Sequence, residues 1–224
     1  MKINVEYVSA NPTGDLHLGH ARGAAWGDSV TRMMKASGYE VCREYYVNDA
    51  GNQIHALALS LAARYAQFFN VDKEMPKDGY YGKDVIAIAK QIAEEKKDSL
   101  LNEPEDIAYA YFRKEGMKQE LAKLQRDLDL FRVHFDVWSS EQQLHDSGQV
   151  ERVLNRLSEL GVTYEQEDAL WFASSRYGDD KDRVLRKSDG SYTYLVPDIA
   201  YHITKFERGF DKLVNLWGAD HHGY

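Results

Sequence analysis

The first 47 residues carry the sequence pattern that most restricts the fold. Residues 2–8 alternate between apolar and polar side chains, which is the period of a strand with one buried face. A turn sequence, NPTG, follows at residues 11–14, and apolar residues then recur at helical spacing from His17 to Gly38. Residues 39–47 are again rich in β-branched and aromatic side chains, as in a strand. Together these segments predict a βαβ unit with two parallel strands, in which the helix begins beside the carboxyl end of the first strand.

The helix of this unit is expected to direct its apolar side chains toward the core. Those side chains are Leu18, Ala21, Ala25, Trp26, Val30, Met33 and Met34. Gly38 ends the helix, because glycine readily adopts the left-handed conformation that follows many helix C-termini.

Beyond residue 52 the sequence predicts more helix than strand. Helical spacing covers residues 53–69, two segments between 84 and 132 that are separated near 102–104, and residues 149–160 and 197–208. Strand-like runs cover residues 163–173, 183–187, 191–196 and 211–217, and Ser-Asp-Gly joins the middle two as in a hairpin. The fold class expected from this order is α/β.

Composition excludes several classes of protein. A chain of 224 residues with 43% hydrophobic and 29% charged side chains is typical of one large or two small globular domains. No segment is apolar enough to span a membrane and the N-terminus does not resemble a signal peptide, so we expect a soluble, cytoplasmic protein. Cys42 is the single cysteine and cannot form an intrachain disulfide. The formal net charge of -8 argues against a protein whose whole surface binds nucleic acid, although a local basic patch remains compatible with it.

The clearest chemical feature is the sequence His17-Leu18-Gly19-His20 at the start of the first expected helix. Helix N-termini bind phosphate, because their unpaired N–H groups and the helix dipole favour negative charge, and imidazoles can donate to phosphate oxygens. Two other interpretations are a capping histidine followed by a histidine at the edge of the core, and a metal site that includes His221 and His222. The metal site is disfavoured because the chain has one cysteine and no His-Glu-x-x-His sequence.

Four segments resemble the arginyl-tRNA synthetases, a family of class I aminoacyl-tRNA synthetases. They are residues 5–24, which contain the "HIGH" signature of that class as HLGH, and residues 44–53, 192–202 and 217–224. The resemblance implies a Rossmann-like class I nucleotide-binding fold, with a mostly parallel sheet and a helical or α+β insertion. It also implies ATP-dependent formation of arginyl-adenylate and transfer of arginine to tRNA(Arg).

The resemblance and the chemistry of the side chains together suggest an arginine site. Asp198 is the candidate partner of the guanidinium group, which a carboxylate can bind in a bidentate manner, with the hydroxyl of Tyr194 beside it. Glu6, Ser9 and Asn11 are expected to hold the α-amino group or the pocket wall. From the residues alone, Asp198 could equally be a helix N-terminal charge and Tyr194 a core aromatic.

The same reasoning suggests an ATP site. His17 and His20 are the expected catalytic residues on the triphosphate, and Gly14 and Gly19 lie in the same signature. Gly218, Asp220 and His221 are expected on the adenosine side. ATP is a substrate accompanied by Mg²⁺, and no bound cofactor or resident metal is expected. Partners are arginine, ATP and tRNA(Arg), with no membrane contact, and a monomer is expected.

The resemblance also implies a division of the chain. Residues 1–69 would form the first half of the catalytic domain, residues 70–190 mainly an insertion with connecting helices and a hairpin, and residues 191–224 a return to the catalytic domain. The family's N-terminal domain, its second signature (KMSKS-like) and its anticodon-binding domain would lie outside these 224 residues. We therefore expect little activity from this chain alone. Gly14 stands where many members have lysine, which suggests a usable second signature in the whole protein.

Two other functions remain open from the sequence. A small nucleotidylyltransferase shares the strand, His-x-Gly-His and helix arrangement, but has no need of Asp198 as a guanidinium partner. A synthetase-like module could instead bind its ligands without turnover.

Overall fold

The structure is a computed structural model that describes residues 1–218. Its main sheet has the strand order β3-β2-β1-β7, formed by β1 (Lys2–Tyr7), β2 (Glu40–Val47), β3 (Val137–Ser140) and β7 (Lys212–Leu216). All three strand pairs are parallel, and Val5 of β1 lies opposite Arg43 of β2 and Val214 of β7. The α/β class and the parallel pairing within the first 47 residues are therefore confirmed. The sequence pattern did not predict β3, which has only four residues.

Strand β1 is buried on both faces. Ile3, Val5 and Tyr7 enter a core cluster with residues of α1 and α4, while Asn4 and Glu6 on the alternate positions are also buried. The expectation of one exposed face was wrong, because helix α7 (Leu195–Glu207) supplies polar partners on that side. Alternation in β1 thus separates a buried apolar face from a buried polar face.

Helix α1 (Leu18–Ala36) meets the sheet through small side chains. Its buried residues are Ala24, Gly27, Asp28 and Thr31. Leu18, Trp26 and Met33 are exposed instead, with 89%, 66% and 61% of their surface accessible. The face predicted from the larger apolar residues was therefore wrong. Because the helix packs close to the sheet, only small side chains fit at the contact.

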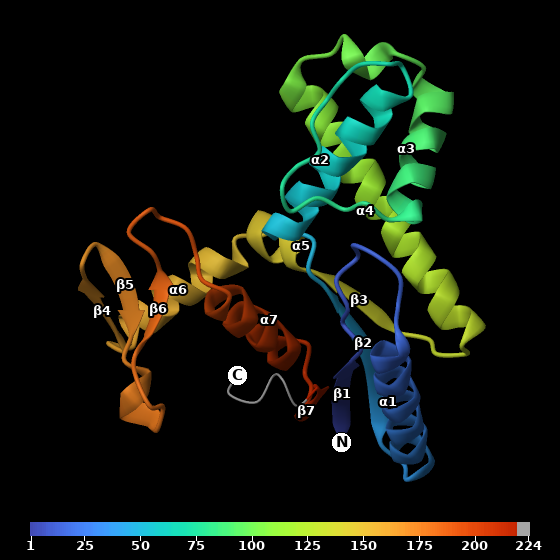
Figure 1. Cartoon of the computed structure of the whole chain (residues 1–224). Coiled ribbons are helices and arrows are strands. Elements are labelled where there is room, and N and C mark those ends of the chain that lie inside the picture. Colours follow the sequence, from blue (N-terminus) through green and yellow to red (C-terminus); the bar gives the residue numbers. More distant parts are fainter. Residues whose placement is uncertain (219–224) are drawn as a thin grey trace.

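Three helices and a short 3₁₀ turn form a separate cluster, seen at the upper right of Figure 1. They are α2 (Asn52–Gln67), α3 (Lys83–Lys96), η1 (Ser99–Leu101) and α4 (Glu105–Leu130). Their core includes Leu57, Leu61, Ile92 and Phe112, and each is almost fully buried. The predicted interruption near residues 102–104 is confirmed, since Pro104 is the N-cap of α4. The long α4 then leads back to the main sheet at β3.

A second set of elements lies on the side of α7, at the left of Figure 1. It comprises α5 (Glu141–Asp146), α6 (Gln149–Glu159) and α7, with η2 (Ser174–Tyr177) and an antiparallel sheet of β4 (Thr163–Gln166), β5 (Ala169–Phe172) and β6 (Arg183–Arg186). One expectation for this region was wrong, because residues 163–173 form two strands around a turn at Glu167 and Asp168. The hairpin expected from residues 183–187 and 191–196 is confirmed in part. Arg186 and Tyr192 form an antiparallel bridge and the Thr193 N–H donates to the Leu185 carbonyl, whereas residues 195–196 already belong to α7. The other edge of β6 pairs with β5. Helix α7 begins at Leu195, two residues before the predicted start.

Candidate active site

A cavity of about 1020 Å³ opens at the carboxyl ends of β1 and β7. Ligands of open parallel sheets usually bind at this edge, where loops and helix termini converge. The lining includes all five residues predicted for arginine, and also Gly218, from the ATP set. These residues are Glu6, Ser9, Asn11, Tyr194, Asp198 and Gly218. The structure therefore brings together side chains from the first strand, the loop after it, and helix α7, although almost 200 residues separate them in sequence.

The loop after β1 turns back on the strand that precedes it. Val8 and Ser9 have positive φ angles of 69° and 42°, and a β-branched residue rarely adopts this conformation. The turn directs the Ser9 hydroxyl toward Glu6, where it donates to Oε1 at 3.0 Å and accepts the backbone N–H of Tyr46 at 3.1 Å. Asn11 donates to Oε1 of Gln53, the second residue of α2, at 2.7 Å. The positive φ angles at Val8 and Ser9 are strained backbone conformations. Strain of this kind costs about 1–3 kcal/mol per residue and is concentrated at functional sites.

Tyr194 and Asp198 lie at the start of α7. Tyr194 is the N-cap residue and is 70% exposed, so it is not a core aromatic. Asp198 lies in the first turn, with about half of its side chain exposed. Burial raises the pKa of Asp198, His202 beside it lowers that pKa, and the Glu6 carboxylate raises it again. Asp198 and Glu6 both line the cavity, so two carboxyl groups face it from different elements.

His17 and His20 form a capping box at the start of α1. Nδ1 of His17 accepts the N–H of Gly19 at 3.1 Å, and Nδ1 of His20 accepts the N–H of His17 at 3.2 Å. The rings stack with centroids 3.7 Å apart. Burial, and secondarily the neighbouring His17, lower the pKa of His20. An imidazole that accepts at Nδ1 in its neutral form carries its proton on Nε2, so the capping role leaves each Nε2–H as a donor toward a ligand.

Gly14 and Gly19, two further ATP candidates, are not among the residues that line the cavity. A Cβ atom on Gly19 would be 2.9 Å from Cε1 of His17, so glycine leaves room for the capping ring. No atom of the described residues lies within 4 Å of the corresponding position on Gly14. Asp220 and His221 fall outside the described residues.

A comparison of the chain with protein families supplies the deciding observation. The family model described as "tRNA synthetases class I (R), catalytic domain" matches residues 1–224. The chain belongs to this family. The resemblance stated from the four sequence segments is thereby confirmed, and the chain is a class I arginyl-tRNA synthetase catalytic-domain sequence.

Relatives of this synthetase sequence agree with the assignment. The arginine–tRNA ligases of Bacillus cereus and Bacillus subtilis are 60% and 59% identical over 223 residues. The chain spans about 40% of the length of these curated relatives. The crystal structure assigned to an arginyl-tRNA synthetase of Campylobacter jejuni matches all of the chain and 49% of its own, with a TM-score of 0.90 and 41% identity.

A more distant structure shows the same fold. The arginyl-tRNA synthetase of Plasmodium falciparum has a TM-score of 0.68 at 22% identity, and the match covers 98% of this chain and 37% of that one. Across residues 1–218 of the synthetase chain, no helix is both long and apolar enough to cross a membrane.

Sequence reasoning missed two buried polar residues at or next to this cavity, Glu141 and Lys205. Glu141, the first residue of α5, is 6% exposed and accepts the hydroxyl of Tyr46 at 2.7 Å. Burial raises the pKa of the Glu141 carboxyl. Lys205 is fully buried and faces Glu6. A signal for Lys205 existed, since it lies seven residues after Asp198 and therefore on the same face of a helix.

Proposed function

We propose that this chain forms the catalytic core of an arginine–tRNA ligase. The protein would activate arginine with ATP to arginyl-adenylate and transfer arginine to tRNA(Arg). The observation that carries the proposal is the convergence of Glu6 and Asp198 on one cavity, at the same sheet edge from which the His17–His20 helix begins. The family membership and the names of the relatives support it.

The charge of the cavity suits a cationic amino acid. Four carboxylates line it, from Glu6, Glu141, Asp179 and Asp198, together with Arg183. Arg183 already pairs with Asp179, whose Oδ2 accepts its Nε–H at 2.7 Å. A guanidinium group would find in Asp198 a carboxylate able to accept two parallel N–H bonds.

We assign the other arginine contacts by position. Tyr194 would place its hydroxyl against the guanidinium group beside Asp198, since both belong to the start of α7. Glu6, Ser9 and Asn11 would hold the α-amino end of arginine and the wall of the pocket, because they follow one another along the end of β1 and its loop. This arrangement orients the arginine carboxylate toward the nucleotide.

ATP would bind at the start of α1. The Nε2–H groups of His17 and His20, with the free N–H groups of the helix N-terminus, would donate to the triphosphate, and Mg²⁺ enters with the nucleotide. Gly14 and Gly19 would allow close approach of the ligand to the backbone. Gly218, Asp220 and His221 would contact the adenosine.

The reaction needs positioning and charge stabilisation more than a general base. The arginine carboxylate oxygen attacks the α-phosphorus of ATP, a new P–O bond forms, and the bond to pyrophosphate breaks. A hydroxyl at the 3′ end of tRNA(Arg) then attacks the arginyl carbonyl, and AMP leaves. His17 and His20 would stabilise the negative charge that develops on the phosphoryl oxygens during the first step.

We also propose the wider setting. Residues 1–69 and 191–224 belong to the catalytic domain and residues 70–190 mainly to its insertion, with β3 returning to the main sheet. The protein would act as a cytoplasmic monomer.

The test is charging of tRNA(Arg) with labelled arginine by the full-length protein. We expect product only when ATP, arginine and tRNA are all present, and rejection of lysine and citrulline, since the first lacks the planar fork and the second lacks the charge. ATP-dependent transfer of AMP to another acceptor without arginine would favour a nucleotidylyltransferase. Binding of ligands with no turnover by the full-length protein would favour a non-catalytic module.

A further inference from the structure

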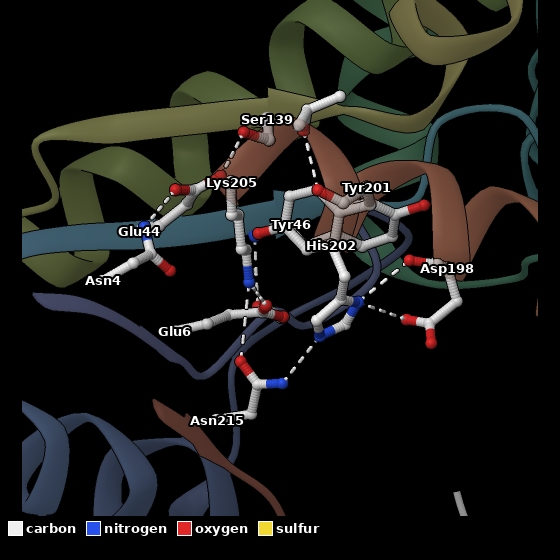
Figure 2. A network of polar contacts seen from close by, with 12 residues as sticks. Asn4, Glu6, Glu44, Tyr46, Ser139, Asp198, Tyr201, His202, Lys205 and Asn215 are labelled. Carbon is white, nitrogen blue, oxygen red and sulfur yellow. Dashed lines mark hydrogen bonds and ion pairs between the residues drawn. The ribbon is translucent and has the colours of Figure 1, made fainter. Parts of the chain in front are cut away.

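A chain of polar contacts connects Glu6 to Asp198 through the interior (Figure 2). Nζ of Lys205 lies 2.6 Å from Oε2 of Glu6 and 3.5 Å from Oδ1 of Asn215 in β7. Nδ2 of Asn215 lies 3.0 Å from Nε2 of His202. Nδ1 of His202 lies 2.9 Å from the carbonyl oxygen of Asp198 and 3.4 Å from its Oδ1. Glu6 and Asp198, the two carboxylates proposed to bind arginine, are thus the two ends of one chain of polar contacts, which we call the relay.

Lys205 is held deep behind the cavity. Its side chain has no exposed surface, and its ammonium group lies 4.0 Å from the ring centroid of Tyr201. A buried ammonium group is very costly unless it is paired with an anion, so Glu6 and Lys205 stabilise each other in ionised form. Lys205 does not line the cavity, so it reaches a ligand there only through its partners.

The chemistry of Lys205 fixes the direction of every hydrogen bond in the relay. An ammonium group donates and cannot accept, so the atom of Asn215 that faces it must be the oxygen. The Asn215 amide nitrogen then donates to Nε2 of His202, which must be unprotonated there. The imidazole consequently carries its proton on Nδ1, where it donates to the carbonyl oxygen of Asp198.

We propose that Lys205 is a positioning residue for arginine. By donating to both Glu6 and Asn215, Lys205 fixes the Glu6 carboxylate and sets the His202 tautomer that holds Asp198. With His202 neutral, the charges of Glu6, Asp198 and Lys205 sum to one negative charge, so the ion pair with Lys205 leaves the relay anionic at the end that holds Asp198. This inference rests on the proposed arginine site.

The decisive variant is Asn215→Asp in the full-length protein. An aspartate at this position can accept from Lys205 but cannot donate, so Nε2 of His202 must become the donor. We expect the His202 tautomer to change from Nδ1–H to Nε2–H or to the doubly protonated form, observed by NMR with nitrogen-labelled histidine. The KM for arginine in tRNA charging should rise at least 10-fold, while the KM for ATP should stay within twofold of the parent value.

Two further variants complete the test. Lys205→Met removes the charge at nearly constant size and should raise the KM for arginine at least 10-fold with a similar loss of the Nδ1–H tautomer. Asn102→Asp is the matched control, because it adds the same charge at an exposed residue of another part of the fold. It should leave both KM values and the His202 signals unchanged. If Lys205→Met does not fold, Asn215→Asp alone decides.

The outcomes separate the inference from the proposed function. A parent protein that does not charge tRNA with arginine would refute the proposed function. A parent protein that does so, with an unchanged His202 tautomer or an unchanged arginine KM in Asn215→Asp, would overturn the role of Lys205. Equal rises in the KM values for arginine and ATP would also overturn it, because they would indicate a general structural effect.

Discussion

The backbone of Gly27 in helix α1 rests directly on the ring of Tyr7 in strand β1. A Cβ atom at Gly27 would lie 2.2 Å from Cγ and Cδ2 of that ring, which is 1% exposed and packs against Phe135 with ring centroids 4.6 Å apart. Gly27→Ala should therefore push the helix away from the sheet. We expect the free energy of unfolding, measured in urea, to fall by about 2 kcal/mol or more.

Gly23→Ala in the same helix is the matched control. In the described part of the chain nothing lies within 4 Å of the Cβ position at Gly23, so the substitution adds only helix propensity. It should raise the free energy of unfolding by about 0.5–1 kcal/mol. Equal effects of the two alanines would show that the contact with Tyr7 does not set the helix position.

The second prediction concerns the stacked histidines. His17→Ala and His20→Ala in the full-length protein should each lower the rate of tRNA charging by roughly 100-fold or more, by comparison with the loss of an oxyanion donor. His17→Ala also removes a helix cap and should cost about 0.5–2 kcal/mol of stability. His134→Ala serves as a control, because His134 is exposed and pairs with Asp129. Near-parent charging by both signature variants would contradict the ATP site.

The third prediction concerns arginine recognition. Asp198→Asn should lose a charge-assisted pair of about 1.5–3 kcal/mol, which corresponds to a KM for arginine raised roughly 10- to 150-fold. The affinity for ATP should hardly change. Asp106→Asn is the matched control, since it also removes a carboxylate from the first turn of a helix. An unchanged arginine response would move the guanidinium contact to another carboxylate, with Glu6 the next candidate, and a parallel loss of ATP affinity would indicate a structural role for Asp198.

The fourth prediction concerns Glu120 of α4. Its side chain is fully buried, neither carboxylate oxygen has a hydrogen-bond partner among residues 1–218, and Nζ of Lys123 is 3.9 Å away. Burial raises the pKa of Glu120 from 4.5 to about 7. The folded state therefore binds a proton more tightly than the unfolded state, so stability from this group is complete below pH 4.5 and is lost as the pH rises through 7.

The corresponding variant is Glu120→Gln. It should flatten the decrease in unfolding free energy between pH 5 and pH 8, and at pH 8 it should be more stable than the parent by about 1–3 kcal/mol. Urea unfolding at the two pH values measures the difference. Glu94→Gln at an exposed pair with Lys90 should change stability by less than about 0.5 kcal/mol at either pH. A parent protein with no decrease over this range would contradict the assignment.

The sequence predicted the elements around the site better than their contacts. The alternation in β1 and the helical spacing after residue 17 are local properties, and both elements form where expected. Which side chains of α1 face the sheet depends on how closely the helix approaches Tyr7, so Ala24 and Gly27 are buried where larger apolar residues were expected. Strand β3 is short and gains its pairing from β2, which a local pattern cannot reveal.

In the candidate site, too, some residues could be predicted from the sequence and others could not. Resemblance to a family pointed to Glu6 and Asp198, and the structure places both on one cavity. Lys205, His202 and Asn215 were not predicted, because their roles depend on α7 and β7 meeting β1 in space. The spacing of Lys205 from Asp198, seven residues along one helix, is a local sign that the two side chains share a face.

The position of β1 between β2 and β7 has a consequence for biosynthesis. Lys2 and Asp211, which bond to each other at the edge of this pairing, lie 209 residues apart. At about 5–20 residues per second, β1 leaves the ribosome roughly 10–40 s before β7. Throughout that interval the edge of β1 that pairs with β7 is unpaired, and Glu6 has no ion pair with Lys205. Nascent chains stalled before residue 205 should therefore be cleaved by proteases near β1, and chains released after residue 216 should resist them.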